Sequence, residues 1–276
     1  MHLFYVQGGG LGHLTRTDKF IKTLGIPEDK VLIITPSTFT DYFKAYQYIK
    51  IAWSDSPSQW SAQIIATLNA QPVYTCYIDA FPFGLKGELL PVYETRPDIN
   101  YVYVSRNLKW ETYLNTLNIK HLPVVFSKTL ILEKLYATHS DWISHYSKKV
   151  LNLSLKSENM PSVPFTNTPY VMVVHSGGQQ DVLKICQKAM ADWADDPNIN
   201  IIVFTQVALQ IKNEKVKVIR NVFPVTQYYK NAIKIYTAAG FNSVQELQQY
   251  RDKHILTPLE KLYDDQFFRT AVLQDM

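Results

Sequence analysis

The sequence lacks the features that mark several large classes of protein. Its 276 residues include only two cysteines, Cys76 and Cys186, each within an apolar stretch. Two cysteines in a chain of this length exclude a disulfide-rich secreted scaffold and predict buried thiols. No run of about 18 apolar residues occurs, and no basic segment followed by a long apolar one opens the chain, so we expect neither a membrane-spanning helix nor a secretory leader. These absences predict a cytoplasmic protein.

An excess of charge of one sign is also missing. The 28 basic and 24 acidic residues leave a net charge of +4, which indicates no nucleic-acid partner unless the basic residues cluster. The densest basic stretch, residues 212–220, is interrupted by Glu214 and several valines. The 18 tyrosines and five tryptophans would allow peripheral contact with a membrane, although such residues lie more often in cores and binding clefts.

What the sequence does have is the pattern of a two-domain α/β protein. A composition of 46% hydrophobic and 19% charged residues is that of a globular chain, and its length favours two domains. Short β-branched or aromatic runs alternate with helical periodicity, which is typical of parallel sheets with crossover helices. We expect strands at residues 3–6, 31–35, 73–78, 101–104, 170–174, 201–204, 216–219, 233–236 and 254–256. We expect helices near residues 14–24, 39–48, 59–68, 108–117, 181–193, 226–230, 243–250 and 264–273.

A proline-bearing polar stretch, residues 157–169, separates the two series of elements. Prolines cannot sit inside a helix or a central strand, so we place the linker there, between a domain at 1–156 and a shorter one at 170–276. Each domain opens with a strand that runs into glycines, at 8–10 and at 177–178. Open α/β sheets bind ligands at the carboxyl ends of their strands, so two facing Rossmann-like domains would share one cleft.

The first glycine turn does not match the known phosphate loops. In a G-x-G-x-x-G motif the third glycine would fall at His13 or at Thr15, and no Gly-Lys-Ser/Thr follows at the Walker offset. We therefore predict no dinucleotide cofactor. A bare turn before a helix can still admit an anion, and His13 at the first turn could serve as a general base. The alternative is that His13 only caps or packs the helix.

A second constellation follows Gly240. Asn242 and Ser243 are helix-capping residue types, so the amides beyond Gly240 could receive a phosphate. Glu246, one turn further, could accept hydrogen bonds from ribose hydroxyls. The alternative needs no ligand, because Ser243 and Glu246 also match the S-x-x-E capping box.

Taken together, several segments resemble the GT-B glycosyltransferases, in particular the branch of the N-acetylglucosaminyl transferase that acts on the lipid-linked cell-wall precursor. The matching segments are residues 8–16, Ser176-Gly177-Gly178, residues 240–247, and Pro258 followed by Asp265-Gln266. Residues 79–84, with Glu88-Leu89 after them, also resemble a group of uncharacterised predicted glycosyltransferases.

The resemblance implies a GT-B fold, with the acceptor mainly on the first domain and a nucleotide-sugar donor, UDP-linked, mainly on the second. His13 matches the family histidine near the reaction centre, and Asp79 is a second candidate base or acceptor contact, or else a loop cap. The base would lie beside Phe223 and Val225, Glu246 would bind the ribose, and Asp265 and Gln266 the sugar hydroxyls. The donor phosphates would meet the glycine turns and their flanks, at Gly10, Gly12, Ser176, Gly177, Gly178, Gly240, Asn242 and Ser243.

No Asp-x-Asp motif lies near this predicted site, so we expect metal-independent, inverting transfer of a hexosyl or N-acetylhexosaminyl group to a lipid, glycan or small-molecule acceptor. Two alternatives stay open: a nucleotide-sugar epimerase or hydrolase, and a non-catalytic nucleotide-sugar-binding subunit. One departure from the family bears on them. The sequence ends at Met276, soon after Gln266, where relatives continue through helices that cross back to the first domain, so an oligomer or partner could complete that surface.

Overall fold

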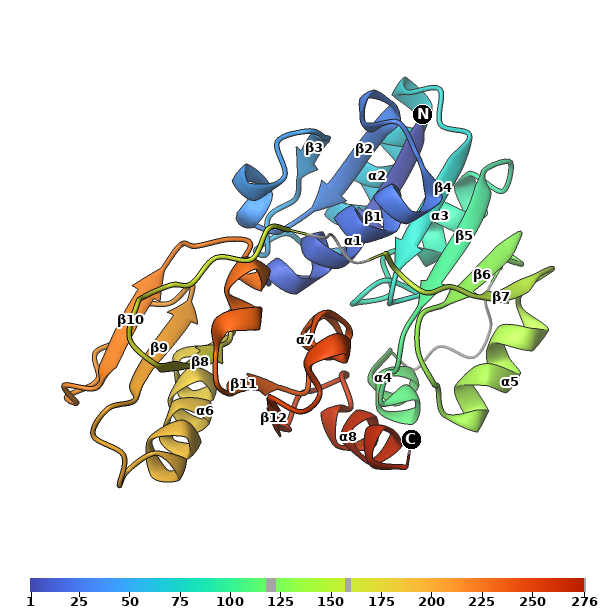
Figure 1. Cartoon of the computed structure of the whole chain (residues 1–276). Helices are drawn as coiled ribbons and strands as arrows, with labels where there is room; N and C mark the ends of the chain where they lie inside the picture. The colour runs from blue at the N-terminus through green and yellow to red at the C-terminus, as the bar shows by residue number, and fades with distance from the viewer. Residues whose placement is uncertain (118–122, 157–159, 276) are drawn as a thin grey trace. The chain divides into compact units, whose positions relative to one another are not determined.

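The computed structural model describes residues 1–117, 123–156 and 160–275, and the chain forms two compact units (Figure 1). The first unit is Met1–Lys156 with Leu262–Asp265, and the second is Ser157–Lys261 with Gln266–Met276. Leu262–Asp265 therefore groups with the first unit, whereas a contiguous second domain over 170–276 would have included it. The first three residues of the expected linker, 157–159, lie outside the described residues.

The first unit contains a seven-stranded parallel sheet. Its strands are β1 (His2–Val6), β2 (Val31–Thr35), β3 (Gln47–Lys50), β4 (Thr75–Asp79), β5 (Asn100–Ser105), β6 (Lys128–Ile131) and β7 (Val150–Asn152). They lie in the order β3-β2-β1-β4-β5-β6-β7. The order reverses direction between β1 and β4, which makes this the topological switch point of a doubly wound sheet.

Helices cover both faces of this sheet because successive strand residues point to opposite sides. The helices are α1 (Leu11–Leu24), α2 (Pro57–Ala70), α3 (Leu90–Thr95), α4 (Trp110–Leu117) and α5 (Ala137–His145), with 3₁₀ turns η1 (Glu28–Lys30) and η2 (Phe39–Tyr42). On one face Tyr5 belongs to a core with Trp60 of α2 and Tyr93 of α3. On the other face Phe4 meets Phe20 of α1, with ring centroids 6.1 Å apart.

The second unit repeats the plan on a smaller scale. Its strands are β8 (Tyr170–Val174), β9 (Asn200–Thr205), β10 (Val216–Arg220), β11 (Ile235–Ala238) and β12 (His254–Thr257), in the order β10-β9-β8-β11-β12. Its helices are α6 (Gln179–Asp192), α7 (Phe241–Glu246) and α8 (Gln266–Gln274), with 3₁₀ turns η3 (Thr226–Asn231) and η4 (Gln248–Tyr250). Here the strand order reverses between β8 and β11. One face of the sheet packs on α6 through Val182, Ile185 and Cys186.

The predicted strands are all present, but one predicted helix is wrong. Residues 39–48 form the short turn η2 and the start of β3, which pairs with β2 through Leu32 and Gln47. The backbone bonds that β2 offers at the sheet edge outweigh a weak local helical preference. The sequence pattern also missed α3, β6, α5 and β7. The edge strand β7 shows no alternation because all three of its residues are exposed.

In the described part of the chain, no helix combines the length and the apolar character needed to cross a membrane.

A buried carboxylate ties the start of the first unit to the loop after β4. Glu88 is 1% exposed, and its carboxylate accepts hydrogen bonds from the Tyr5 hydroxyl at 2.6 Å and from the Lys86 amide at 2.7 Å. Gly84 has a φ of +80°, and a Cβ there would overlap this carboxylate. A glycine is therefore required beside Glu88 on both conformational and steric grounds.

We expect Glu88→Gln to lower the free energy of unfolding by about 2–4 kcal/mol. The substitution replaces one carboxylate oxygen with an NH₂ group, which would face a group that now donates a hydrogen bond to that oxygen. The measurement is urea unfolding followed by circular dichroism. Glu94→Gln is the matched control, since Glu94 is exposed on α3 and should change stability by less than about 0.5 kcal/mol. Equal effects of the two substitutions would contradict the structural role of Glu88.

Candidate functional site

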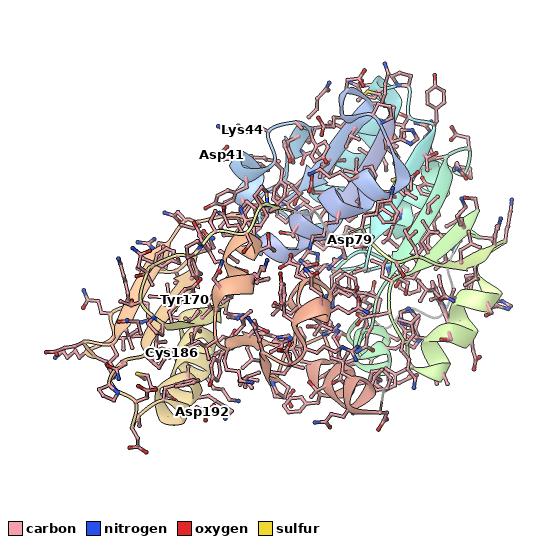
Figure 2. The ribbon with its side chains drawn as sticks, viewed as in Figure 1. Asp41, Lys44, Asp79, Tyr170, Cys186 and Asp192 are labelled. Atoms are coloured by element: carbon pink, nitrogen blue, oxygen red, sulfur yellow. The ribbon has the colours of Figure 1, made fainter. Side chains whose placement is uncertain are left out.

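The site in the first unit lies at the switch point of its sheet. Val6 at the end of β1 pairs with Asp79 at the end of β4, so the glycine turn that follows β1 and the carboxylate that ends β4 are neighbours. Asp79 is labelled in Figure 2. Crevices at the carboxyl ends of strands that flank a switch point are the usual ligand sites of open α/β sheets.

Three side chains meet at this point: His13 and Arg16 of α1, and Asp79. His13 Nδ1 lies 2.8 Å from Asp79 Oδ2. Arg16 donates from Nε to Asp79 Oδ1 at 2.8 Å and from Nη2 to Oδ2 at 2.6 Å. Arg16 and Asp79 are 4% and 6% exposed, whereas 18% of the His13 side chain is exposed. The buried ion pair thus supports a histidine that still reaches the surface.

The glycine turn sets the position of the His13 imidazole. Gly8 has a φ of +147°, and a Cβ at this position would overlap the His13 ring. Gly10 is the N-cap of α1 in an extended conformation, and a Cβ there would meet nothing within 4 Å. Bare glycines predict room for a ligand, but at Gly8 that room is filled by His13 itself.

The residue after Asp79 is held in an unusual backbone conformation. Ala80 has a φ of 63°, which is left-handed and unfavourable for a residue with a Cβ. Its N–H donates to the Val104 carbonyl at 3.0 Å, and its carbonyl accepts from the Tyr103 hydroxyl at 2.9 Å. Strained backbone of this kind concentrates at functional sites, and here it sets the direction in which β4 ends.

The charges of the cluster follow from burial and from the guanidinium. Burial lowers the pKa of His13 below its ordinary 6.5, and the hydrogen bond to Asp79 opposes part of that change. Burial alone would raise the pKa of Asp79, but Arg16 and the bond from His13 hold it well below 3.8. At neutral pH the imidazole is neutral and the carboxylate ionised. His13 Nδ1 lies 2.8 Å from this carboxylate, which can only accept, and 3.0 Å from Arg16 Nη2, which can only donate. Arg16 Nη2 already donates to Asp79 Oδ2 at 2.6 Å, so we assign the proton to Nδ1, on the shorter contact, and the lone pair to Nε2.

The second unit places two glycine turns at its own switch point. One follows β8 and ends with Gly178 as the N-cap of α6; the other follows β11 and ends with Gly240 as the N-cap of α7. Both caps are extended glycines without a side-chain hydrogen bond, and a Cβ on either would meet nothing within 4 Å. Helices α6 and α7 therefore both begin at a glycine that supplies no capping side chain.

A charged cluster that the sequence pattern did not predict lies at the start of α6. The Lys261 ammonium pairs with the Asp181 carboxylate, and His175 Nε2 lies 3.6 Å from the same oxygen. Burial lowers the pKa of His175, while Asp181 opposes that change. A strand-end histidine followed six residues later by an aspartate in a first helical turn was a signal that could have located this pair. The sequence pattern did not indicate Lys261, because it follows β12, 80 residues after Asp181, and meets Asp181 only in the folded chain.

The capping-box alternative for Ser243 and Glu246 is wrong. Helix α7 begins at Phe241 with Gly240 as its cap, so Asn242 and Ser243 lie inside the first turn rather than before it. A helical residue cannot cap its own helix. The Glu246 carboxylate instead accepts a hydrogen bond from the Tyr229 hydroxyl at 3.2 Å.

The remaining predicted donor residues are spread over both units. Ser176 and Gly177 lie in the β8–α6 turn, where a Cβ on Gly177 would overlap the His175 ring. Phe223 and Val225 lie in the loop between β10 and η3, and the Val225 carbonyl accepts from the Tyr228 amide at 3.0 Å. Gly12 belongs to α1 of the first unit.

No protein-family model matches the chain, and no curated protein matches it either. Solved structures do match. The glycotransferase of kitacinnamycin is 12% identical with a TM-score of 0.63, over 99% of this chain and 84% of that one. MurG of Acinetobacter baumannii is 10% identical with a TM-score of 0.55, over 99% and 83%. The structure of S. aureus MnaA with UDP is 12% identical with a TM-score of 0.63, over 95% and 80%.

The chain has the GT-B fold. Both sheets of a GT-B fold are therefore present, with seven and five strands. In the described residues no group of three or more His, Cys, Asp or Glu side chains is placed to hold a metal ion.

Asp265 and Gln266 are the two residues predicted to bind the sugar. Asp265 belongs to the first unit and Gln266 to the second. Asp265 accepts a hydrogen bond from the Tyr136 hydroxyl at 2.6 Å, and its carbonyl accepts from Asn107 Nδ2 at 3.0 Å. Gln266 is 3% exposed, and its side-chain oxygen accepts from the Leu259 amide at 3.0 Å. Both residues have structural roles in the chain, and their contact with a sugar stays a prediction.

Replacing Asp79 with Asn should lower the pKa of His13 further, because the carboxylate that favours imidazolium is removed. It should also destabilise the fold by about 3–5 kcal/mol at neutral pH, since Arg16 would lose the buried carboxylate to which it donates two hydrogen bonds. The native pKa of Asp79 is depressed, so its contribution is complete above about pH 4 and is lost as the pH falls through the folded value. NMR titration of the histidine ring nitrogens and urea unfolding at several pH values measure both effects.

The matched control is Asp41→Asn, in which an exposed aspartate of η2 is changed. It should leave the His13 titration and the stability unchanged. A destabilisation by Asp79→Asn that stays constant from neutral pH down to strong acid would show that the carboxylate charge is not what matters.

Proposed function

We propose that the protein is a glycosyltransferase that moves a sugar from a UDP-linked donor to an acceptor hydroxyl with inversion. The observation that carries the proposal is the neutral, partly exposed His13, whose Nδ1 is bound to an ionised Asp79. The GT-B fold supports it, since several matching structures are described as glycosyltransferases. It accounts for the geometry because a base needs a free lone pair and a fixed orientation.

In the proposed step, His13 Nε2 takes the proton of the acceptor hydroxyl while the acceptor oxygen bonds to the anomeric carbon. The bond from that carbon to the diphosphate breaks, and its electron pair leaves with the UDP oxygen. The imidazolium that forms lies against the Asp79 carboxylate, which stabilises it. Arg16 keeps Asp79 ionised and oriented, so it is a positioning residue. His13 is the catalytic residue, and Asp79 acts through it.

The second unit supplies groups suited to the leaving diphosphate. Helix α6 spans Gln179–Asp192, and its uncapped first amides carry the positive end of a helix dipole beside Gly178. Such donors stabilise a developing oxyanion without a metal. We extend the proposal to the β11–α7 turn at Gly240, Asn242 and Ser243, to Glu246 for the ribose, and to Phe223 and Val225 for the base. The MnaA structure with UDP supports a uridine nucleotide.

The first test is a thermal-shift panel of UDP-, GDP- and dTDP-sugars with the native protein and with His13→Ala. We expect UDP-sugars to raise the melting temperature of both proteins equally. Release of UDP in the presence of an acceptor library should fall by roughly 10²- to 10⁴-fold in the variant, the size expected for loss of a general base. A flat panel, or unchanged turnover by the variant, would refute the proposal. Epimerised or hydrolysed sugar formed without any acceptor would favour an epimerase or hydrolase instead.

The second test uses charge at the start of α6. Gly178→Asp and Gly178→Asn should both fold normally, because both residues are good helix caps and the added Cβ meets nothing within 4 Å. The Asp and Asn side chains have nearly the same shape, but only the Asp carboxylate carries a negative charge that repels a diphosphate. We expect Gly178→Asp to abolish stabilisation by UDP and Gly178→Asn to retain part of it. Equal responses to UDP would place the diphosphate away from α6.

A further inference from the structure

A short turn before α2 holds one tryptophan outward. The turn runs from Ala52 to Asp55, with the Ala52 amide bonded to Asp55 Oδ2 at 3.0 Å and the Asp55 amide bonded to the Ala52 carbonyl at 3.1 Å. The indole N–H of Trp60 donates to the same carbonyl at 2.9 Å. These bonds fix the backbone on both sides of Trp53, so the direction of its side chain is set by the fold.

The Trp53 side chain is 44% exposed. One edge is anchored against the buried ring of Trp60, with centroids 6.1 Å apart at an interplanar angle of 75°. Trp60 is itself fully buried, and the Lys86 ammonium lies 4.4 Å from its ring centroid. Among the described residues none accepts a hydrogen bond from the indole N–H of Trp53. An anchored but half-exposed indole is a rigid aromatic surface with a free donor.

This surface lies beside the turn that seats the candidate base. A Cβ on Gly9 would lie 3.0 Å from Trp53 Nε1 and 3.1 Å from its Cζ2, while a Cβ on the preceding Gly8 would overlap the His13 ring. Consecutive Cα atoms are about 3.8 Å apart, so the facing edges of the two rings are within roughly 12 Å of each other. A ring stacked on the indole, with a hydroxyl on the ring or on a substituent, can span a separation of up to this size.

We propose that Trp53 is an acceptor-binding residue on which a flat ring of the acceptor stacks. The ligand chemistry is a ring with an apolar face and at least one hydroxyl, either a pyranose or an aryl ring. The face would lie on the indole, and a ring oxygen or hydroxyl would accept from the Trp53 N–H. The identification of this ring as the acceptor rests on the proposed function, but binding of the ring to Trp53 does not depend on turnover.

The binding test uses protein labelled with 5-fluorotryptophan. The five tryptophans give five ¹⁹F resonances, and Trp53→Phe identifies the one from Trp53. Phenyl β-D-glucopyranoside, methyl β-D-glucopyranoside and catechol are titrated separately to their solubility limits. We expect a saturable shift of the Trp53 resonance with at least one probe, and the responding probe tells pyranose from aryl recognition. No shift of that resonance with any probe overturns the proposal.

The kinetic test compares Trp53→Tyr with Trp53→Leu, using the ring-bearing acceptor that turns over fastest. Tyr keeps a flat ring, whereas Leu keeps only bulk. We expect Leu to raise the acceptor KM roughly tenfold with kcat little changed, and Tyr to restore most of the difference. Loss of kcat alone, or equal effects of Tyr and Leu, would contradict stacking. Melting temperatures of both variants verify that they fold.

Two further outcomes separate this inference from the proposed function. Stabilisation by UDP without any response of Trp53 would leave glycosyl transfer standing and remove Trp53 from the acceptor site. A Trp53 response without stabilisation by any nucleotide sugar would support ring binding and refute the proposed use of a nucleotide-sugar donor. The last experiment measures binding of the protein to vesicles of phosphatidylcholine and phosphatidylglycerol. If Trp53→Leu abolishes vesicle binding and no ring probe binds, Trp53 is a membrane contact and the assignment is overturned.

Discussion

The ion pair between Asp79 and Arg16 is the interaction on which the rest of the first unit's site depends. A carboxylate with 6% of its surface exposed can stay ionised only beside a permanent cation, and Arg16 of α1 meets both of its oxygens. This bidentate contact holds the first turn of α1 against the end of β4. His13, one turn before Arg16 on the same helix, is brought to Asp79 as a consequence, and Gly8 must lack a side chain so that the ring fits.

The second unit uses the same local plan of a strand, a glycine turn and a helix. Each of its two glycine turns leads from a strand into a helix whose N-cap has no side-chain bond. A helix N-terminus that begins at a bare glycine favours an anion, whereas a neutral histidine on an ionised carboxylate favours removal of a proton. The proposed transfer assigns the leaving group to the second unit and the base to the first.

The strand pattern was readable from the sequence because each central strand is a short apolar run bounded by polar or glycine residues. The failures have local causes. Residues 47–50 pair with β2 at the edge of the sheet, and that contact does not appear in their own periodicity. The Ser243–Glu246 capping box failed because the helix starts earlier, at Phe241. A motif of four residues cannot specify where along it a helix begins.

The sequence alone determined the α/β class, the glycine turns and the candidacy of His13, because these depend on neighbours in the chain. Only the tertiary structure decided what His13 and Arg16 bind, since Asp79 is 63 residues from Arg16 and joins it through the order of the strands. The same holds for Leu262–Asp265, which packs with the first unit, and for Trp53, which reaches Gly9 through a turn after β3. Such contacts follow from sheet order and loop direction, which no local pattern encodes.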